Sequence, residues 1–425
     1  MTYIRNFGKL ATNPGRRDAL NILEAGYEAI NTERIMLSKI KIEGDELIIK
    51  NKSYDLSIYK NIYFIGVGKC ALEAGRVMEI IMGDRIRDGV VIDNVKGTLE
   101  RIRTYYGTHP WPSEKNISAT KEIMELLERS TEDDLIIVVI SGGGSALMCM
   151  PYESSCQDLI DISRTMTKKG ADIYELNTVR KHLSAIKGGQ MAQMAYPAET
   201  ISLLFSDVLG DDISVIASGP TVKDGTTVYD AEEILKKYGI FNKDNLPPLR
   251  TTPKEDKWFE RVANILIATN SDAIEAMEVE ARELGYETVP GNKKVSGKAR
   301  IVGEQFAKTN LLPGRVQISG GETTVDIKGS GEGGRNQETA LGALSHISDN
   351  AVFIAAGSDG IDNTDAAGAI CDKEIKERAE KLHLDPNQFI SDNDSYNFFA
   401  RVGGQIMTGP TGSNVSDLYI LLTYK

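Results

Sequence analysis

The chain has 425 residues, of which 41% are hydrophobic and 26% are charged, and its formal net charge is −12. This composition is that of a globular protein and excludes a disordered or membrane-embedded chain, while the length predicts two domains, or three. The negative charge argues against a nucleic-acid-binding surface, which is normally basic, but leaves room for a locally positive pocket.

Apolar runs of strand length alternate with longer helical patterns, which is typical of an α/β protein with mainly parallel strands. The apolar spacing up to Ser38 is helical. Further helices are expected at residues 71–82 and 112–129, the second with Ser113 as its N-cap. Strands are expected in the first half of the chain at residues 61–65, 88–93, 135–140 and 200–205.

A less regular region separates the two halves of the chain. It contains Asn245-Leu-Pro-Pro248 and the charged run from Lys254 to Lys257, and it is the predicted domain connection. We therefore predict one domain at residues 1–245 and a second at residues 246–425. Strands of the second domain are expected at residues 264–268, 315–318, 351–355 and 418–422.

The turn Gly66-Val-Gly-Lys69 joins a predicted strand to a predicted helix. Glycine permits positive φ and close approach of a ligand, and the lysine adds a mobile charge suited to phosphate or carboxylate. The turn does not match the Walker A spacing, and Leu72 stands where the third glycine of a dinucleotide fingerprint would fall. A tight connection with a solvated lysine is the structural alternative.

The segment Ser141-Gly-Gly-Gly-Ser145 follows the most apolar strand. Three consecutive glycines are costly in backbone entropy, and successive N–H groups in such a turn can form an anion-binding nest. A nucleophilic serine would need the order GxSxG on this turn. The segment therefore favours an anion cradle over a hydrolase site.

Cations and carboxylates are concentrated around the next strand. Residues 177–189 include Arg180 and Lys187 and predict a positive wall for a phosphate-bearing ligand, with an exposed helical face as the alternative. Asp207 directly follows the strand at 200–205 and carries the oxygen ligands that Mg²⁺ prefers. Asp211 is a second metal candidate that could equally cap a helix.

The second half repeats this pattern of glycine and charge. Ser319-Gly-Gly-Glu-Thr323 closes a strand, and Arg335 begins a helical pattern from which its guanidinium can fork onto phosphate oxygens. The structural alternative for Arg335 is a simple helix-cap loop. Asp359 stands in a loop whose alternative is a set of Asx turns, and the final polar loop at residues 409–417 suits binding or structure better than catalysis.

Lysine, arginine, aspartates and glycine nests together suit phosphoryl transfer, which needs charge neutralisation, in-line positioning and usually Mg²⁺. We therefore predict a phosphate-handling enzyme. The predicted metal ligands are Asp207, Asp211 and Asp359. The predicted substrate- or nucleotide-binding residues are Gly66, Gly68, Ser141, Gly142, Gly143, Gly144, Ser145, Arg180, Lys187, Gly320, Glu322, Asn336, Asp359 and Asn414.

Seven motifs in order over nearly the whole chain resemble the glycerate 2-kinase (MOFRL) family. They are Gly66-Val-Gly-Lys69, Ser141-Gly-Gly-Gly-Ser145, Asn177-Thr-Val-Arg-Lys-His-Leu-Ser184, Ser206-Asp-Val-Leu-Gly-Asp211, Ala217-Ser-Gly-Pro-Thr221, Gly334-Arg-Asn-Gln-Glu338 and Thr411-Gly-Ser-Asn-Val415. The resemblance implies an N-terminal Rossmann-like doubly wound sheet, a smaller C-terminal α/β domain and an interdomain active-site cleft. It also implies ATP and Mg²⁺ as cofactors and conversion of D-glycerate to 2-phosphoglycerate.

The resemblance further implies roles for three catalytic residues. Lys69 would orient and neutralise glycerate or the transferring phosphoryl group, Arg335 would stabilise transition-state charge, and Asp207 would hold Mg²⁺ or assist the hydroxyl. The family's TDGxDG pattern is Ser358-Asp-Gly-Ile-Asp-Asn363 here, and its TGTNVND pattern loses one amide at Ser416.

Two alternatives come from other functional classes. A hydroxypyruvate reductase dependent on NAD(P)H is suggested by the Gly66-Val-Gly68 turn, and a non-catalytic sugar-phosphate-binding regulator would need a DNA-binding module that the sequence does not suggest. The absence of a secretory signal and of a long apolar run, with four scattered cysteines, predicts a cytoplasmic protein without membrane association. A homodimer is a further expectation that no residue pattern demonstrates.

Overall fold

The computed structural model describes residues 2–240 and 247–424, and the chain divides into two compact units. The continuous unit is residues 35–267, and the discontinuous unit combines residues 1–34 with residues 268–425. The boundary predicted between residues 245 and 246 lies outside the described residues. The observed division differs from the predicted one because the N-terminal helices belong with the C-terminal part of the chain.

The continuous unit is built on a six-stranded sheet with the order β6-β5-β4-β7-β8-β9. Each pair from β6 to β8 is parallel. If these six strands are numbered 1 to 6 along the chain, their order in the sheet is 3-2-1-4-5-6, which is the order of a doubly wound Rossmann-like sheet. The predicted sheet is therefore confirmed. The strands are β4 (Asn61–Val67), β5 (Ile86–Asp93), β6 (Arg103–Tyr106), β7 (Asp134–Ile140), β8 (Glu199–Phe205) and β9 (Val262–Ala268).

The helices predicted in this unit are also present. In α4 (Ala71–Met82), Leu72, Val77 and Met78 form part of the buried face, and the helix ends at Gly83 with positive φ. In α5 (Glu114–Glu128), the backbone N–H of the predicted N-cap Ser113 donates to Asn116 Oδ1 at 3.1 Å. The other helices are α6 (Gly144–Leu147), α7 (Cys156–Lys168), α8 (Ile173–His182), α9 (Gln190–Ala195) and α10 (Val228–Lys237).

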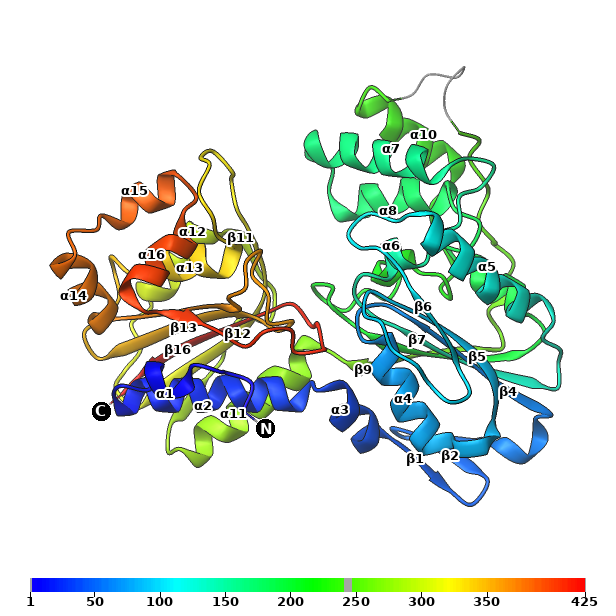
Figure 1. Ribbon diagram of the computed structural model, residues 1–425, viewed down its shortest axis with the longest axis horizontal. Coiled ribbons are helices and arrows are strands. Elements are labelled where there is room, and N and C mark those ends of the chain that lie inside the picture. Colours follow the sequence, from blue (N-terminus) through cyan, green and yellow to red (C-terminus); the bar gives the residue numbers. More distant parts are fainter. Residues whose placement is uncertain (1, 241–246, 425) are drawn as a thin grey trace. The chain divides into compact units, whose positions relative to one another are not determined.

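Two smaller substructures complete the continuous unit. The helices α7, α8 and α10 pack around their own apolar cluster, which includes Met166, Val179 and Leu235 (Figure 1). An antiparallel meander consists of β1 (Ile40–Glu43), β2 (Glu46–Ile49) and β3 (Lys52–Asp55). Short 3₁₀ turns lie at Leu56–Ile58, Gly83–Arg85, Ile216–Ser218 and Asp256–Trp258.

The discontinuous unit contains a seven-stranded mixed sheet with the order β10-β12-β16-β13-β14-β15, in which β11 also pairs with β12. The strand β16 runs antiparallel to both β12 and β13, so the carboxyl ends of β12 and β13 meet the start of β16. The strands are β10 (Glu287–Val289), β11 (Val295–Lys298), β12 (Arg315–Thr324), β13 (Ala351–Gly357), β14 (Gly368–Asp372), β15 (Gln405–Ile406) and β16 (Asp417–Thr423).

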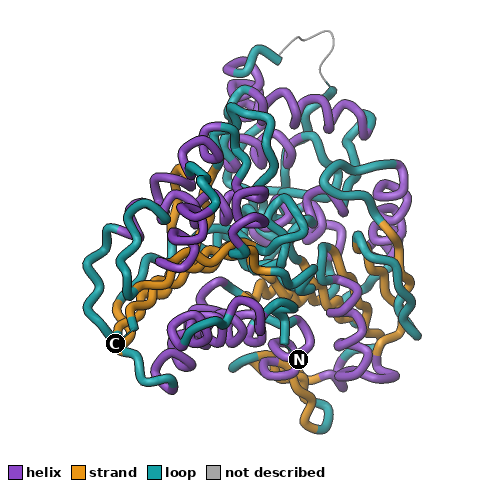
Figure 2. Tube along the Cα trace, turned by 60° about the vertical axis from the view of Figure 1, so that its left-hand side comes forward, coloured by secondary structure: helices purple, strands orange, loops and turns teal. Residues whose placement is uncertain are grey.

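Helices cover both faces of this sheet, as Figures 1 and 2 show. The helix α2 packs against α11 and against β13 and β16, while α12, α13 and α16 lie on the other face. The helices of this unit are α1 (Phe7–Leu10), α2 (Pro14–Ala29), α11 (Asn270–Glu283), α12 (Ala299–Ala307), α13 (Arg335–Ala343), α14 (Lys373–Lys381), α15 (Pro386–Ser391) and α16 (Ser395–Val402). The helix α3 (Thr32–Lys39) spans the boundary between the two units. No described helix is long and apolar enough to cross a membrane.

A buried ion pair joins the N-terminal helix to the C-terminal part of the discontinuous unit. Arg16 on α2 donates from Nε and Nη2 to the two carboxylate oxygens of Asp372, at 2.6 and 2.7 Å, and both side chains are buried. Removing one partner of a buried pair leaves an uncompensated charge, at a cost of about 3 kcal/mol or more.

We therefore expect Arg16→Ala to lower the free energy of unfolding by about 3 kcal/mol. Arg17→Ala is the matched control, because Arg17 is the next residue of the same helix and is exposed. Urea denaturation followed by circular dichroism measures both variants. Equal midpoints for the two would contradict a stabilising role for the Arg16 pair.

Candidate active site

The loops after β4 and β7 lie side by side at the point where the strand order of the continuous unit reverses. The N–H of Ser141 donates to Val67 O at 2.9 Å, and the N–H of Lys69 donates to Gly142 O at 3.0 Å. In open α/β sheets, ligands bind at the carboxyl ends of the strands at such a switch point. The structure thus brings together the two glycine-rich loops that the sequence singles out.

Two glycines make this approach possible. Gly68 has φ +128°, and a Cβ there would lie 2.1 Å from Ser141 Oγ. Gly143 has φ +83°, and a Cβ there would lie 3.2 Å from both Lys69 Cγ and His109 Cδ2. The stem of Lys69 and the ring of His109 therefore lie against the loop at Gly143.

Part of the predicted anion cradle is used within the fold. The N–H of Ser141 bonds to Val67 O, and the N–H of Gly144 donates to Ser141 O at 3.1 Å. The hydroxyl of Ser145 lies 3.0 Å from that of Ser218, which donates to Asn177 Oδ1 at 2.7 Å. These bonds connect three of the polar motifs, and the ligand contact expected of the glycine loop stays a prediction.

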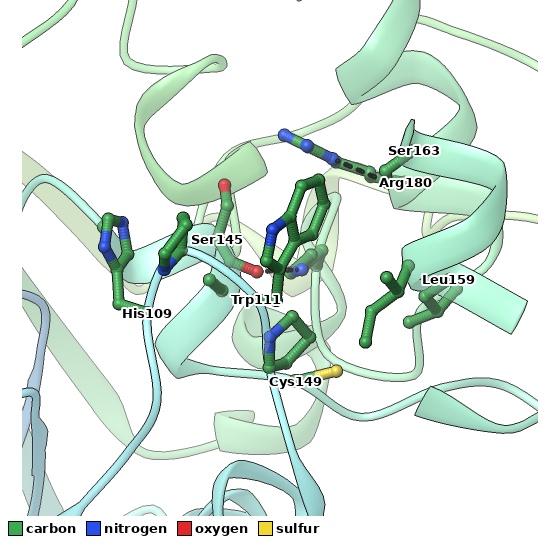
Figure 3. A pocket seen from close by; sticks show the side chains of 13 residues that line it. His109, Trp111, Ser145, Cys149, Leu159, Ser163 and Arg180 are labelled. Carbon is green, nitrogen blue, oxygen red and sulfur yellow. Dashed lines mark hydrogen bonds between the residues drawn. The ribbon is translucent and has the colours of Figure 1, made fainter. Parts of the chain in front are cut away.

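A pocket of about 270 Å³ opens beside this loop (Figure 3). Two of the predicted cations, Arg180 and Lys187, line it, together with the predicted Gly143 and Ser145. Sequence reasoning missed the rest of its wall, although the segment Pro110-Trp-Pro112 is an unusual turn that could have drawn attention. The lining residues are His109, Pro110, Trp111, Pro112, Gly143, Ser145, Ala146, Cys149, Leu159, Ile160, Ser163, Arg180 and Lys187.

The pocket is positively charged. Lys187 Nζ donates to Ser145 O at 2.6 Å, and burial lowers the pKa of Lys187 to about 8. Arg180 Nε donates to Ser163 Oγ at 3.5 Å, and burial lowers the pKa of Arg180 as well. The pKa of His109 is lowered by burial and then by the charge of Lys69. An anion entering the pocket would relieve the repulsion among these groups.

The cationic segment at residues 177–189 is divided between two roles. Lys181 forms a buried ion pair with Asp224 at 3.2 Å. His182 is buried and bonds through its ring nitrogens to Arg250 O at 2.7 Å and Thr226 Oγ1 at 3.2 Å. These two residues support the fold, whereas Arg180 and Lys187 line the pocket.

The predicted metal ligands belong to different units. Asp207 and Asp211 follow β8 in the continuous unit, and Asp359 follows β13 in the discontinuous unit. Asp211 has φ +57° and donates its N–H to Val208 O at 3.0 Å, so it shapes the turn. Across residues 2–240 and 247–424, no three His, Cys, Asp or Glu side chains are grouped to hold a metal ion.

In the discontinuous unit, Arg335 is the first residue of α13 and is held by two carboxylates. Its Nε and Nη2 donate to Asp417 at 2.6 and 3.0 Å, and its Nη1 pairs with Glu322. Burial lowers the pKa of Arg335, but the carboxylate of Asp417 more than reverses this, so the guanidinium stays charged. The side chain is still 36% exposed, which leaves an edge accessible to a ligand.

Two buried carboxylates that the sequence analysis did not select position this arginine. Asp417 begins β16 opposite Gly321 and Gly357, is fully buried, and also accepts Asn336 Nδ2 at 3.0 Å. Burial raises the pKa of Asp417, and Arg335 offsets this only in part. Asp362 accepts the N–H of Asn336 at 3.0 Å and so caps α13, and burial raises its pKa to about 6.

The glycines before Glu322 have a structural role that differs from the expected strand-end loop. The strand predicted at residues 315–318 continues to Thr324, because β11 pairs with its last residues. A Cβ at Gly320 would lie 1.7 Å from Asn270 Oδ1, and one at Gly321 would lie 2.2 Å from Val295 O. Glycine is thus required here by packing, and ligand contact at Gly320 stays a prediction.

The last two predicted binding residues form turns. Asp359 Oδ1 accepts the N–H of Ile361 at 3.1 Å, and Asn414 Oδ1 accepts the N–H of Ser416 at 3.2 Å. The Asx turn that was the alternative for Asp359 is therefore present. One turn follows the end of β13 and the other precedes the start of β16. Both therefore lie at the strand ends where Asp417 binds Arg335.

The chain is similar to known proteins over nearly its whole length. A family model described as a domain of unknown function (DUF4147) matches residues 18–248, and the MOFRL family model matches residues 315–417. Glycerate 2-kinase from Pyrococcus horikoshii is 37% identical, covering 96% of this chain and 97% of its own. The crystal structure of glycerate kinase from Thermotoga maritima has a TM-score of 0.83 at 33% identity, covering 96% of this chain and 99% of its own. A protein from Agrobacterium vitis with a provisional hydroxypyruvate reductase name is 36% identical, covering 84% of this chain and 86% of its own.

Proposed function

The chain belongs to the glycerate 2-kinase family, and from this premise we propose that it transfers the γ-phosphoryl group of ATP to the 2-hydroxyl of D-glycerate, releasing 2-phosphoglycerate and ADP. The observation that carries the proposal is the group of cations beside the glycine loop at the switch point, where Lys69 lies against Gly143 and Arg180 and Lys187 line the adjoining pocket. Positive charge at this place suits two anionic substrates.

The proposed roles follow from charge and position. Lys69 neutralises the transferring phosphoryl group, because its stem lies against the loop at Gly143 and its ammonium group supplies a positive charge beside that loop. Arg335 stabilises the charge of the transition state. Its Nε and Nη2 atoms are held by Asp417, so Nη1, which pairs with the half-exposed Glu322, is the donor atom that phosphate oxygens can reach.

Mg²⁺ and ATP are part of the proposal. Enzymes usually hold Mg²⁺ with one or two carboxylates plus substrate phosphates and waters, so a single strand-end carboxylate is a sufficient protein contribution. Asp207 fits this, because it lies two residues after the end of β8, the neighbour of β7 in the parallel sheet. When bound, Mg²⁺ neutralises phosphate charge.

The reductase alternative requires an acidic residue free to bind a ribose hydroxyl at the end of the second strand. Asp93 ends β5, but it is buried and accepts the N–H groups of Leu72 at 2.9 Å and Val95 at 3.1 Å. This carboxylate is occupied by the first turn of α4 and by the turn that follows β5. We accordingly expect no NADH oxidation with hydroxypyruvate.

The proposal is tested by coupling the reaction to enolase. Purified protein is incubated with ATP, Mg²⁺ and D-glycerate, with and without phosphoglycerate mutase. We expect enolase signal without the mutase, because the product is 2-phosphoglycerate. Signal only with the mutase would place the phosphate on another hydroxyl, and no ADP would contradict the kinase assignment.

The cytoplasm is the proposed location. All four cysteines are buried free thiols, which is typical of a reducing compartment. The homodimer expected from the sequence stays a prediction.

A further inference from the structure

Among the described residues, two cations in the pocket of the continuous unit, one buried and one partly buried, have no carboxylate partner. Lys187 is 4% exposed and bonds to a backbone carbonyl, and Arg180 bonds to a serine hydroxyl. Within the described residues, neither side chain takes part in an ion pair, although Lys181, on the same segment, is paired with Asp224. Buried charges without a counter-ion are costly and are normally paired. An anion from outside the chain would supply such a partner.

The size and walls of the pocket restrict that anion. Its volume of about 270 Å³ is below the range of about 300–1,000 Å³ that drug-sized ligands occupy. Trp111, Leu159 and Ile160 supply apolar walls, and Figure 3 shows Trp111 between His109 and Leu159. The guanidinium of Arg164 lies 4.5 Å from the centroid of the Trp111 ring and holds it in place. These dimensions suit a short acid better than a nucleoside triphosphate.

The pocket also has a direction. In Figure 3, Arg180 and Ser163 lie at one end of the pocket and His109 lies at the other, with Ser145 on the His109 side. Lys69 lies against the same loop glycine, Gly143, as His109. A small acid whose carboxylate meets the cations would present its hydroxyl carbon toward Lys69. This is the orientation that phosphorylation of a 2-hydroxyl requires.

We propose that this pocket is the acceptor subsite, which binds the carboxylate of a short 2-hydroxy acid through Arg180 and Lys187, and that the phosphates of ATP bind elsewhere. This inference rests on the proposed function, and it specifies which of the two substrates binds in the pocket beside the glycine loop. The lowered pKa of Lys187, whose titratable neighbours are Arg180 and the thiols Cys149 and Cys156, agrees with a site that binds an anion.

The first test measures ligand binding by tryptophan fluorescence, independently of catalysis. The chain has two tryptophans, Trp111 and Trp258, and Trp258 lies outside the pocket against Tyr196. In the W258F variant the emission of Trp111 alone is recorded during titration. We expect a saturable change with D-glycerate, none with glycerol, which lacks the carboxylate, and none with ADP. A response to ADP that D-glycerate cannot reproduce would overturn the assignment and make the pocket a nucleotide site.

The second test separates the two substrates kinetically. We expect Arg180→Gln to raise the KM for D-glycerate by about 30-fold or more, because a buried charge contact is lost, and to change the KM for ATP little. A rise confined to the KM for ATP would overturn the assignment. Lys187→Met should raise the KM for D-glycerate without lowering Tm, because it removes an unpaired buried charge. The control Lys181→Met should lower Tm, because it leaves Asp224 unpaired.

The two tests distinguish failure of the subsite from failure of the proposed function. If the wild-type protein does not phosphorylate D-glycerate but Trp111 responds to another short hydroxy acid, such as glycolate or lactate, the subsite stands and the substrate assignment falls. If D-glycerate is phosphorylated while Arg180→Gln and Lys187→Met keep the wild-type KM for it, the subsite falls and the kinase stands.

Discussion

Replacing Arg335 with alanine is expected to lower kcat by about 10³-fold or more, because an arginine that neutralises a transferring phosphoryl group contributes on this order. The KM values for ATP and D-glycerate should change much less, since the charge that Arg335 meets develops in the transition state. Steady-state kinetics of ADP release measures both quantities. Arg282→Ala is the matched control, because Arg282 is an exposed arginine of the same unit with a weak surface partner, Glu278.

A loss of folding must be separated from this loss of activity. Arg335→Ala leaves the buried Asp417 without its partner and is therefore also destabilising. Arg335→Lys keeps a positive charge beside Asp417 but loses the two-pronged donor geometry. We expect the lysine variant to retain a Tm near that of the wild type and still to lose most of its kcat. Wild-type kcat in a folded Arg335→Lys variant would show that a point charge is sufficient and would contradict the role given to the guanidinium fork.

The second large effect is expected at Lys69. Lys69→Met keeps the aliphatic stem that lies against Gly143 and removes only the charge, so the loop should retain its conformation. We expect kcat/KM to fall by about 10²–10³-fold, the range found when one group that stabilises developing charge is removed. Lys121→Met, at an exposed lysine of α5 in the same unit, is the control.

The outcome at Lys69 also bears on His109. The charge of Lys69 contributes to the lowered pKa of His109, so Lys69→Met should raise that pKa toward its ordinary value. NMR titration of the His109 ring protons tests this without reference to turnover. An activity within a few-fold of wild type, together with an unchanged His109 titration, would remove Lys69 from the site.

Strands and the two main loops were predictable because their signals are local. Apart from Asn61, the runs at residues 61–65 and 135–140 are apolar, as is typical of strands buried on both faces, and both are central strands of the sheet. The glycines of Gly66-Val-Gly68 and Ser141–Ser145 predicted tight turns at the ends of these strands. Their contact followed from topology, since the two strands are neighbours on either side of the switch point.

Other features depend on long-range contacts, which cannot be predicted from local sequence patterns. Helical spacing in residues 14–29 predicts a helix but not its partner, which is fixed by the Arg16–Asp372 pair. The strand β6 is only partly buried along its four residues, so its pattern is weak, and the His109–Pro112 loop that follows it went unnoticed. In the sequence, Asp417 is only the last residue of a polar loop, and no local pattern indicates that it is fully buried against Arg335.

The central claim is phosphoryl transfer to the 2-hydroxyl of D-glycerate, and ³¹P NMR of the reaction mixture tests it most directly. Wild-type protein is mixed with ATP, Mg²⁺ and D-glycerate, and the product resonance is identified by adding authentic 2-phosphoglycerate. The account predicts a single new phosphomonoester resonance that grows on addition of that compound, together with ADP. A spectrum in which ATP remains intact, or in which the new resonance belongs to 3-phosphoglycerate, would contradict it.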